Sequence, residues 1–275
     1  MIDKYKIRYP LGKLKKRTIE YFRKKNISKT YARLPNRSYE RLMDIKNIHN
    51  GKDCFIVGNG PSLKQLDLTR LYGKHCIFFN GAFDLRENTS PECRIHLCED
   101  RLVFEDHQEK LNSLDGLLIY PSDLRHFINS KNPIILEFHR AYSEKNKDWP
   151  QSVDINKKFP IFYWGGTVAY LGLQVAQWMG FENIYIIGVD LSYSIPDSVI
   201  KDGAVLTSTD DDPNHYKSSY FGKGLRWHLP EPERMLRAFK HFAEHHDHKK
   251  NIYNAGYGGN LNCFERVDFE YVSGK

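Results

Sequence analysis

From about residue 50 onward, short apolar runs alternate with polar or amphipathic stretches along the chain. These runs have the length and composition of β-strands, and they cover residues 54–59, 76–80, 94–98, 116–121, 133–138, 183–190 and 251–255. Several are apolar nearly throughout, which is typical of strands covered on both faces of a mainly parallel sheet.

Helices are expected between these strands, at residues 62–72, 100–113, 167–180 and 231–247. In the clearest of them, Val168, Leu171 and Val175 are spaced by three or four residues. Gly180 then gives a helix C-cap signal just before the next strand. The alternation predicts an α/β fold, with a doubly wound, mainly parallel, Rossmann-like sheet in a single domain.

Residues 191–230 break this alternation. They are rich in Ser, Asp, Gly, Pro and Tyr and show no clean periodicity. A long irregular segment in a compact domain is usually functional, and this one begins at the end of a predicted strand, where α/β proteins place their sites. We therefore interpret residues 191–230 as a lid.

A glycine-rich turn follows the first predicted strand. Gly58 and Gly60 permit close backbone approach, and a helix starting near Ser62 would direct free N–H groups at the turn. Asn59 can offer a donor and an acceptor to a ribose or a base. The motif lacks the third glycine of GxGxxG. It predicts either a mononucleotide site or a plain strand–turn–helix connection capped by Ser62.

A second pair of glycines precedes the predicted helix 167–180. Gly165 and Gly166 stand directly before Thr167. This sequence predicts either a second helix N-terminus that meets a ligand or a flexible turn capped by Thr167.

The lid contains groups that suit proton transfer. His215 could take a proton from a hydroxyl nucleophile, and Tyr193, Tyr216 and Tyr220 could donate hydrogen bonds to a departing phosphate. The run Asp210–Asp212 could hold Mg²⁺, but the sequence favours a solvated loop. No metal site is predicted.

Basic residues are concentrated at the N-terminus. The chain has 41 Lys and Arg against 34 Asp and Glu, a net charge of +7. Residues 1–50 hold 15 against 4, so residues 51–275 hold 26 against 30 and are mildly acidic. We interpret residues 1–50 as a basic, helical arm before the catalytic domain 51–275. The arm would bind an anionic membrane surface or pack on the domain, and it lacks a nucleic-acid-binding motif.

No apolar run reaches 18 residues, and the N-terminus has no apolar signal region. The five cysteines fit neither a disulfide framework nor a CxxC metal site. We expect a cytoplasmic protein, held at the membrane face by the arm, and the sequence leaves a homo-oligomer open.

Residues 56–68, 167–194 and 211–224 resemble the bacterial sialyltransferases of the Campylobacter type. They also resemble uncharacterised proteins related to the archaeal 6-hydroxymethylpterin diphosphokinase. The resemblance implies a GT-A-like, metal-independent, inverting glycosyltransferase without a cofactor. It would transfer a sialic-acid-like or Kdo-like sugar from a CMP-sugar to a glycan or lipid-linked acceptor. The alternatives are an ATP-using diphosphokinase with Mg²⁺ on Asp190 and Asp210–Asp212, and an inactive nucleotide-sugar-binding protein.

The same resemblance implies roles for individual residues. The base would be His215, followed by Tyr216, while Tyr193 is displaced by one position from a phosphate-binding tyrosine of the family. Asp100 belongs to the acidic pair Glu99-Asp100, which stands where the family has a third asparagine. The residues expected to bind the nucleotide or substrate are Gly58, Asn59, Gly60, Ser62, Asn80, Asp100, Gly165, Gly166, Thr167 and Asp190.

Overall fold

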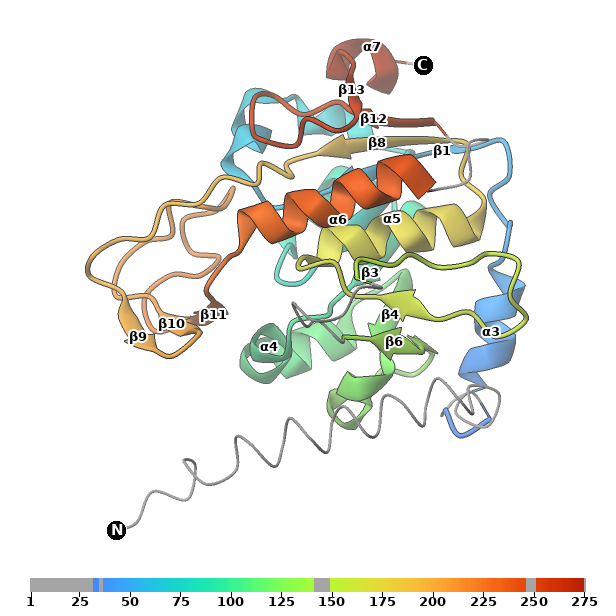
Figure 1. Ribbon diagram of the computed structural model, residues 1–275, viewed down its shortest axis with the longest axis horizontal. Helices are drawn as coiled ribbons and strands as arrows, with labels where there is room; N and C mark the ends of the chain where they lie inside the picture. The colour runs from blue at the N-terminus through green and yellow to red at the C-terminus, as the bar shows by residue number, and fades with distance from the viewer. Residues whose placement is uncertain (1–31, 35–36, 141–148, 246–250, 275) are drawn as a thin grey trace.

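The computed structural model describes residues 32–34, 37–140, 149–245 and 251–274 (Figure 1). Most of the predicted basic arm, residues 1–31, therefore lies outside the described residues. Its end is helix α3 (Ser38–Asp44), which packs on the domain. Leu42 is buried in the main core, and its carbonyl accepts a hydrogen bond of 2.8 Å from the Trp178 indole.

The centre of the molecule is an eight-stranded sheet in which every pair of neighbours is parallel. Its order is β13-β12-β8-β1-β2-β3-β4-β5. The strands are β1 (Asp53–Val57), β2 (His75–Phe79), β3 (Arg94–Leu97), β4 (Leu117–Pro121), β5 (Ile134–Leu136), β8 (Asn183–Ile187), β12 (Asn251–Asn254) and β13 (Glu265–Arg266). This arrangement confirms the predicted α/β fold class, and each predicted strand is present.

The strand order reverses between β1 and β8. From β1 the chain runs outward through β2, β3 and β4 to β5, then returns to place β8 on the other side of β1. Ligands of open α/β sheets bind in the crevice at the carboxyl ends of the strands where such a reversal occurs. The fold therefore places the glycine turn after β1 beside the start of the lid after β8.

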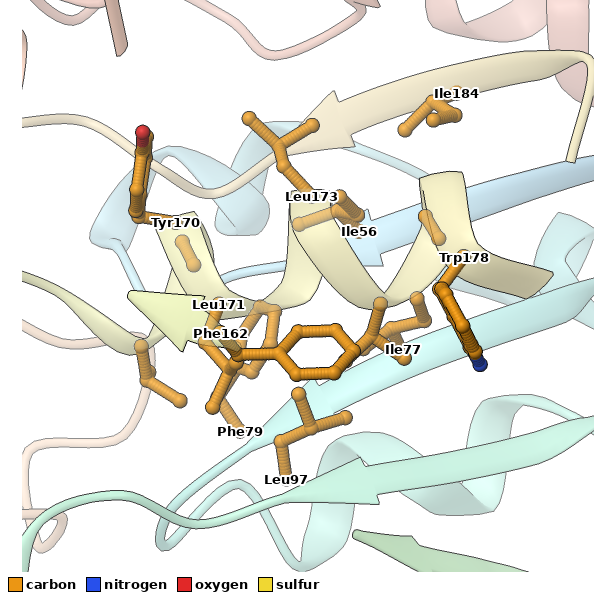
Figure 2. Packing of buried hydrophobic residues seen from close by; sticks show 14 of the residues in the cluster. Ile56, Ile77, Phe79, Leu97, Phe162, Tyr170, Leu171, Leu173, Trp178 and Ile184 are labelled. Carbon is orange, nitrogen blue, oxygen red and sulfur yellow. The ribbon is translucent and has the colours of Figure 1, made fainter. Parts of the chain in front are cut away.

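Both faces of the sheet are covered, which explains why several of its strands are apolar nearly throughout. On one face, Ile56 and Ile77 pack in the core cluster that includes α5 (Val168–Met179) and α6 (Pro232–His245). Figure 2 shows this layer, with residues of α5 beside the strands. On the other face, Phe55 and Val57 pack with residues of η2 (Leu68–Leu71) and α7 (Phe269–Ser273).

Close packing between α5 and the sheet depends on one small residue. A Cβ added at Gly172 would lie 2.5 Å from Cζ of Phe79, which is itself buried. Real Cβ atoms do not approach so closely, so the β2 ring reaches the helix only because residue 172 lacks a side chain. No helix among the described residues is long and apolar enough to cross a bilayer.

The predicted helix at 62–72 is wrong. This stretch forms two 3₁₀ helices instead, η1 (Pro61–Gln65) and η2 (Leu68–Leu71), separated by Leu66 in an extended conformation. Asp67 starts the second one, because its side chain accepts a hydrogen bond from the Thr69 amide. The predicted helix at 100–113 is present as α4 (Arg101–Ser113), with a non-helical residue at His107.

Short elements complete the domain. They are η3 (Asp84–Asn88), η4 (Pro91–Cys93), η5 (Ser122–Phe127) and a separate two-stranded ladder of β6 (Phe138–His139) and β7 (Phe162–Tyr163).

The lid is more regular than the sequence predicted. It contains a three-stranded antiparallel sheet of β9 (Ile200–Asp202), β10 (Val205–Thr207) and β11 (Arg226–His228). These strands are too short to produce a visible period-2 pattern. Arg226 of β11 makes ion pairs with Glu105 and Asp106 of α4, at 3.1 and 2.6 Å, and so fixes the lid to the domain.

Candidate functional site

A pocket of about 720 Å³ opens at the carboxyl ends of β1 and β8. Its walls come from the glycine turn, the strand end at 188–190, the start of α5, the start of α6 and residues of the lid. This volume is within the range of small-molecule sites. Among the predicted residues, those that line it are Gly58, Asn59, Gly60, Asn80, Asp100, Gly166, Thr167, Asp190, Tyr193, His215 and Tyr220.

The glycine turn runs against the backbone of the β8 end. The amide of Gly58 donates to Ile187 O and that of Gly60 to Gly188 O, both at 2.8 Å. A Cβ at Gly58 would lie 2.1 Å from Gly188 O, and one at Gly60 would lie 2.4 Å from Asp190 Oδ2. These two positions need glycine because two main chains meet there.

Ser62 anchors Asp190 and lies outside the pocket lining. Asp190 Oδ1 accepts from Ser62 Oγ at 2.5 Å, and Oδ2 accepts from the Ser62 amide at 3.0 Å. The predicted set of helix N–H groups directed at the turn is wrong, because η1 is a 3₁₀ helix of five residues and the Ser62 amide is bound to Asp190.

Two asparagines line the pocket from the ends of β1 and β2. Asn59 Nδ2 donates to the Tyr220 hydroxyl at 2.9 Å. Asn80, in the left-handed conformation with φ of 48°, accepts at Oδ1 from the Glu99 amide at 3.2 Å. Because a backbone N–H only donates, that bond fixes Asn80 Oδ1 as the acceptor and leaves the Nδ2 group as a donor for the pocket.

The acidic pair after β3 forms a charged wall. Asp100 caps α4 through the Leu102 amide, at 2.8 Å, and its other oxygen lies 3.3 Å from Nδ1 of His228 in the lid. Glu99 is buried and pairs with Arg140 at 3.0 Å. Burial raises the pKa of Glu99 to about 7, although the Arg140 charge opposes that shift.

His215 is oriented by a buried carboxylate. Its Nδ1 lies 2.6 Å from Oδ2 of Asp212, whose side chain is only 4% exposed. Asp212 also accepts hydrogen bonds from the backbone amides of Asn214 and Phe221. With Nδ1 donating to Asp212, a neutral imidazole carries its lone pair on Nε2, and His215 lines the pocket.

The three predicted tyrosines occupy different environments. Tyr193 lines the pocket, and burial raises its pKa to about 12, so it remains a neutral hydrogen-bond donor. Tyr220 also lines the pocket, with its hydroxyl bound by Asn59. Tyr216 lies outside the lining and packs beside the second core cluster, while its amide donates to Asn59 O at 2.6 Å.

Of the two glycines before α5, one lines the pocket and the other does not. Gly166 and Thr167 line the pocket, and Thr167 caps the helix by accepting from the Ala169 amide at 3.4 Å. Gly165 is buried outside the lining, where a Cβ would lie 2.3 Å from the Tyr170 ring. It therefore serves packing.

Of the aspartates proposed for Mg²⁺ under the diphosphokinase alternative, Asp190, Asp210 and Asp212 accept hydrogen bonds from protein groups, and Asp211 is exposed. Both oxygens of Asp190 accept from Ser62 and both oxygens of Asp212 accept from the lid. Asp210 accepts from Ser198 and Thr209. In the described parts of the chain, no group of three or more His, Cys, Asp or Glu side chains could hold a metal ion. These residues do not fit a Mg²⁺ site as they are arranged.

Sequence reasoning missed the role of Asp212. In the sequence Asp212 is one of three consecutive aspartates in the lid, and of these three it alone is buried and contacts His215. Its position three residues before the histidine was the available signal. Other missed lining residues come from segments with no motif, namely Arg140, His228 and Arg234.

A family model described as "6-hydroxymethylpterin diphosphokinase MptE-like" matches residues 25–196. No curated relative matches the chain.

Among solved structures, the MAf glycosyltransferase from Magnetospirillum magneticum AMB-1 is similar, with a TM-score of 0.48 and 17% identity over 84% of this chain. The chain spans only 38% of that protein's length. The sialyltransferase CstII from Campylobacter jejuni, with CMP-3FNeuAc, has a TM-score of 0.40 and 14% identity over 78% of this chain and 86% of its own. Similarities at this level carry no information about substrates.

Proposed function

The chain belongs to the family of proteins similar to the 6-hydroxymethylpterin diphosphokinase MptE, and within that family we propose that it is a glycosyltransferase. Its donor would be a CMP-activated acidic sugar, sialic-acid-like or Kdo-like, and its acceptor a hydroxyl of a glycan or a lipid-linked glycan. The observation that carries the proposal is the His215–Asp212 pair at 2.6 Å, placed over the same pocket as the glycine turn.

The pocket lining supports a nucleotide donor. The glycine turn, Asn59 and Asn80 correspond to the residues by which the resembling sialyltransferases bind CMP. Asn80 Nδ2 supplies a directed donor at the end of β2, and Gly166 and Thr167 stand at the N-terminus of α5, where backbone N–H groups favour a phosphate.

In the proposed reaction, the acceptor hydroxyl attacks the anomeric carbon of the sugar. His215 Nε2 takes the hydroxyl proton as the new C–O bond forms. The bond from that carbon to the phosphate oxygen breaks, and CMP leaves with the electron pair. Tyr193, neutral because of its raised pKa, would donate a hydrogen bond to the departing phosphate.

The family name favours a second candidate, a diphosphokinase that transfers pyrophosphate from ATP. The arrangement of the aspartates gives it less support, because among the described residues Asp190 and Asp212 belong to no group of three or more His, Cys, Asp or Glu side chains that could hold a metal ion.

The test compares the two reactions directly. Purified protein is incubated with CMP-sialic acid or CMP-Kdo in EDTA, and CMP release is measured with and without glycan acceptors. A parallel reaction contains ATP, Mg²⁺ and 6-hydroxymethylpterin, and AMP release is measured.

We expect CMP release in EDTA, reduced at least a hundredfold in His215→Ala, since removal of a general base commonly costs about 10²–10⁴ in rate. The matched control is His241→Ala on α6, which lies outside the pocket lining. AMP release that requires Mg²⁺, or full activity of His215→Ala, contradicts the proposal.

A further inference from the structure

Tyr220 lies directly against the proposed base. The rings of His215 and Tyr220 are stacked, with centroids 4.3 Å apart and planes inclined by 13°. Phe221 contacts the same imidazole edge-on, with centroids 5.1 Å apart. Together with the Asp212 carboxylate, these rings restrict the His215 side chain on several sides.

The Tyr220 hydroxyl extends from the lid to the sheet. It accepts hydrogen bonds from Asn59 Nδ2 at 2.9 Å and from the Gly81 amide at 3.1 Å. Asn59 follows β1 and Gly81 follows β2, so a single oxygen joins the lid to both strand ends. The ring lies close to residue 81, where an added Cβ would be 3.1 Å from Tyr220 Cε2 and would make a tight contact.

A second bond between the same segments strengthens the connection. The Tyr216 amide donates to Asn59 O at 2.6 Å. Both the main chain and the side chain of Asn59 are therefore tied to the lid segment that carries His215. Burial raises the pKa of the Tyr220 phenol well above its usual range, so the hydroxyl stays neutral at any physiological pH.

We propose that Tyr220 is a positioning residue that couples the glycine turn to His215. By holding Asn59 and Gly81 at its hydroxyl and the imidazole on its ring face, Tyr220 would place the base correctly only when the turn is in its nucleotide-binding conformation. This inference rests on the proposed function, and it replaces the direct phosphate contact that the sequence suggested for Tyr220.

The test separates the hydroxyl from the ring. Tyr220→Phe keeps the stacking but leaves two donors without their acceptor, whereas Tyr220→Leu removes both contacts. The control is Tyr120→Phe, which removes a buried hydroxyl that donates to Leu111 O at 2.9 Å, away from the pocket. Urea unfolding first establishes that each variant is folded.

We expect Tyr220→Phe to lower kcat about tenfold and to weaken CMP binding about tenfold, each equivalent to about 1.4 kcal/mol. Tyr220→Leu should lower kcat about tenfold further, because His215 loses its stacking partner. Tyr120→Phe should remain within about twofold of the wild type in both. A Tyr220→Phe variant with unchanged kcat and CMP affinity overturns the inference.

A measurement without turnover keeps this inference distinct from the proposed reaction. In NMR spectra of histidine ring protons, with His215 assigned by the His215→Ala variant, CMP should shift the His215 signals in the wild type. With each protein saturated with CMP, the shift should be smaller in Tyr220→Phe. This result supports the coupling even if no CMP-sugar is turned over, and a shift of the same size in Tyr220→Phe refutes it.

Discussion

The contact between Asp212 and His215 gives the sharpest test of the proposed chemistry, and the substitution Asp212→Asn addresses it with little change in volume. In the native protein, Oδ2 of Asp212 accepts from His215 Nδ1 at 2.6 Å and from the Phe221 amide at 3.1 Å. An asparagine that keeps the Oδ1 bond to the Asn214 amide presents its NH₂ group to those two donors.

That geometry should reduce both the activity and the stability of the variant. The imidazole can relieve the clash by taking the other tautomer, in which Nδ1 accepts and Nε2 carries the proton. It then cannot act as a base, and we expect kcat to fall about 10²–10⁴-fold, or about 2.7–5.5 kcal/mol in activation free energy. The Phe221 amide loses its acceptor, which should lower the free energy of unfolding by about 1–3 kcal/mol.

The assay combines steady-state CMP release, CMP affinity by calorimetry and urea unfolding. Because Asp212 does not line the pocket, CMP affinity should stay within about threefold of the wild type. A folded Asp212→Asn protein that keeps a third or more of the wild-type kcat refutes the reasoning, since His215 would then not depend on its carboxylate.

Three further outcomes are expected. Gly60→Ala should weaken CMP binding at least tenfold in calorimetry, because the new Cβ would lie 2.4 Å from Asp190 Oδ2. Gly172→Ala should lower the free energy of unfolding in urea by about 1–3 kcal/mol, since its Cβ would overlap the Phe79 ring. Glu99 has a pKa of about 7 when folded against about 4.3 when unfolded, so the native state binds the extra proton. Its contribution to stability is therefore complete below about pH 4 and is lost as pH rises through 7, by up to about 4 kcal/mol. Urea unfolding at pH 5 and pH 8 should show this decrease in the wild type and a smaller one in Glu99→Gln.

The sheet was predictable because its strands are buried on both faces. After its first residue, β1 (Asp53–Val57) is apolar and buried at every position, so its pattern can be recognised without knowing which strands lie beside it. The stretch after Gly60 was not predictable in the same way. Its apolar residues suited a helix, but an extended Leu66 and the Asp67 cap divide it into two short 3₁₀ helices.

Part of the candidate site was also predictable from the sequence. Strand ends carry Asn59, Asn80 and Asp190, and the topology of a doubly wound sheet brings such ends together. The partnership of Asp212 with His215, and the exclusion of Gly165 from the pocket, depend on how the lid folds and how Tyr170 packs. Those are tertiary contacts that local spacing does not encode.

The pairing of β1 with β8 also has a consequence for synthesis on the ribosome. Asp53 and its partner Asn183 are 130 residues apart, and the amides of Gly58 and Gly60 find their acceptors only at Ile187 and Gly188. At about 5–20 residues per second, roughly 7–26 seconds would pass between synthesis of the glycine turn and synthesis of the β8 end that accepts its hydrogen bonds. During that interval an apolar β1 has an unpaired edge, which makes this protein a candidate for chaperone binding while it is translated.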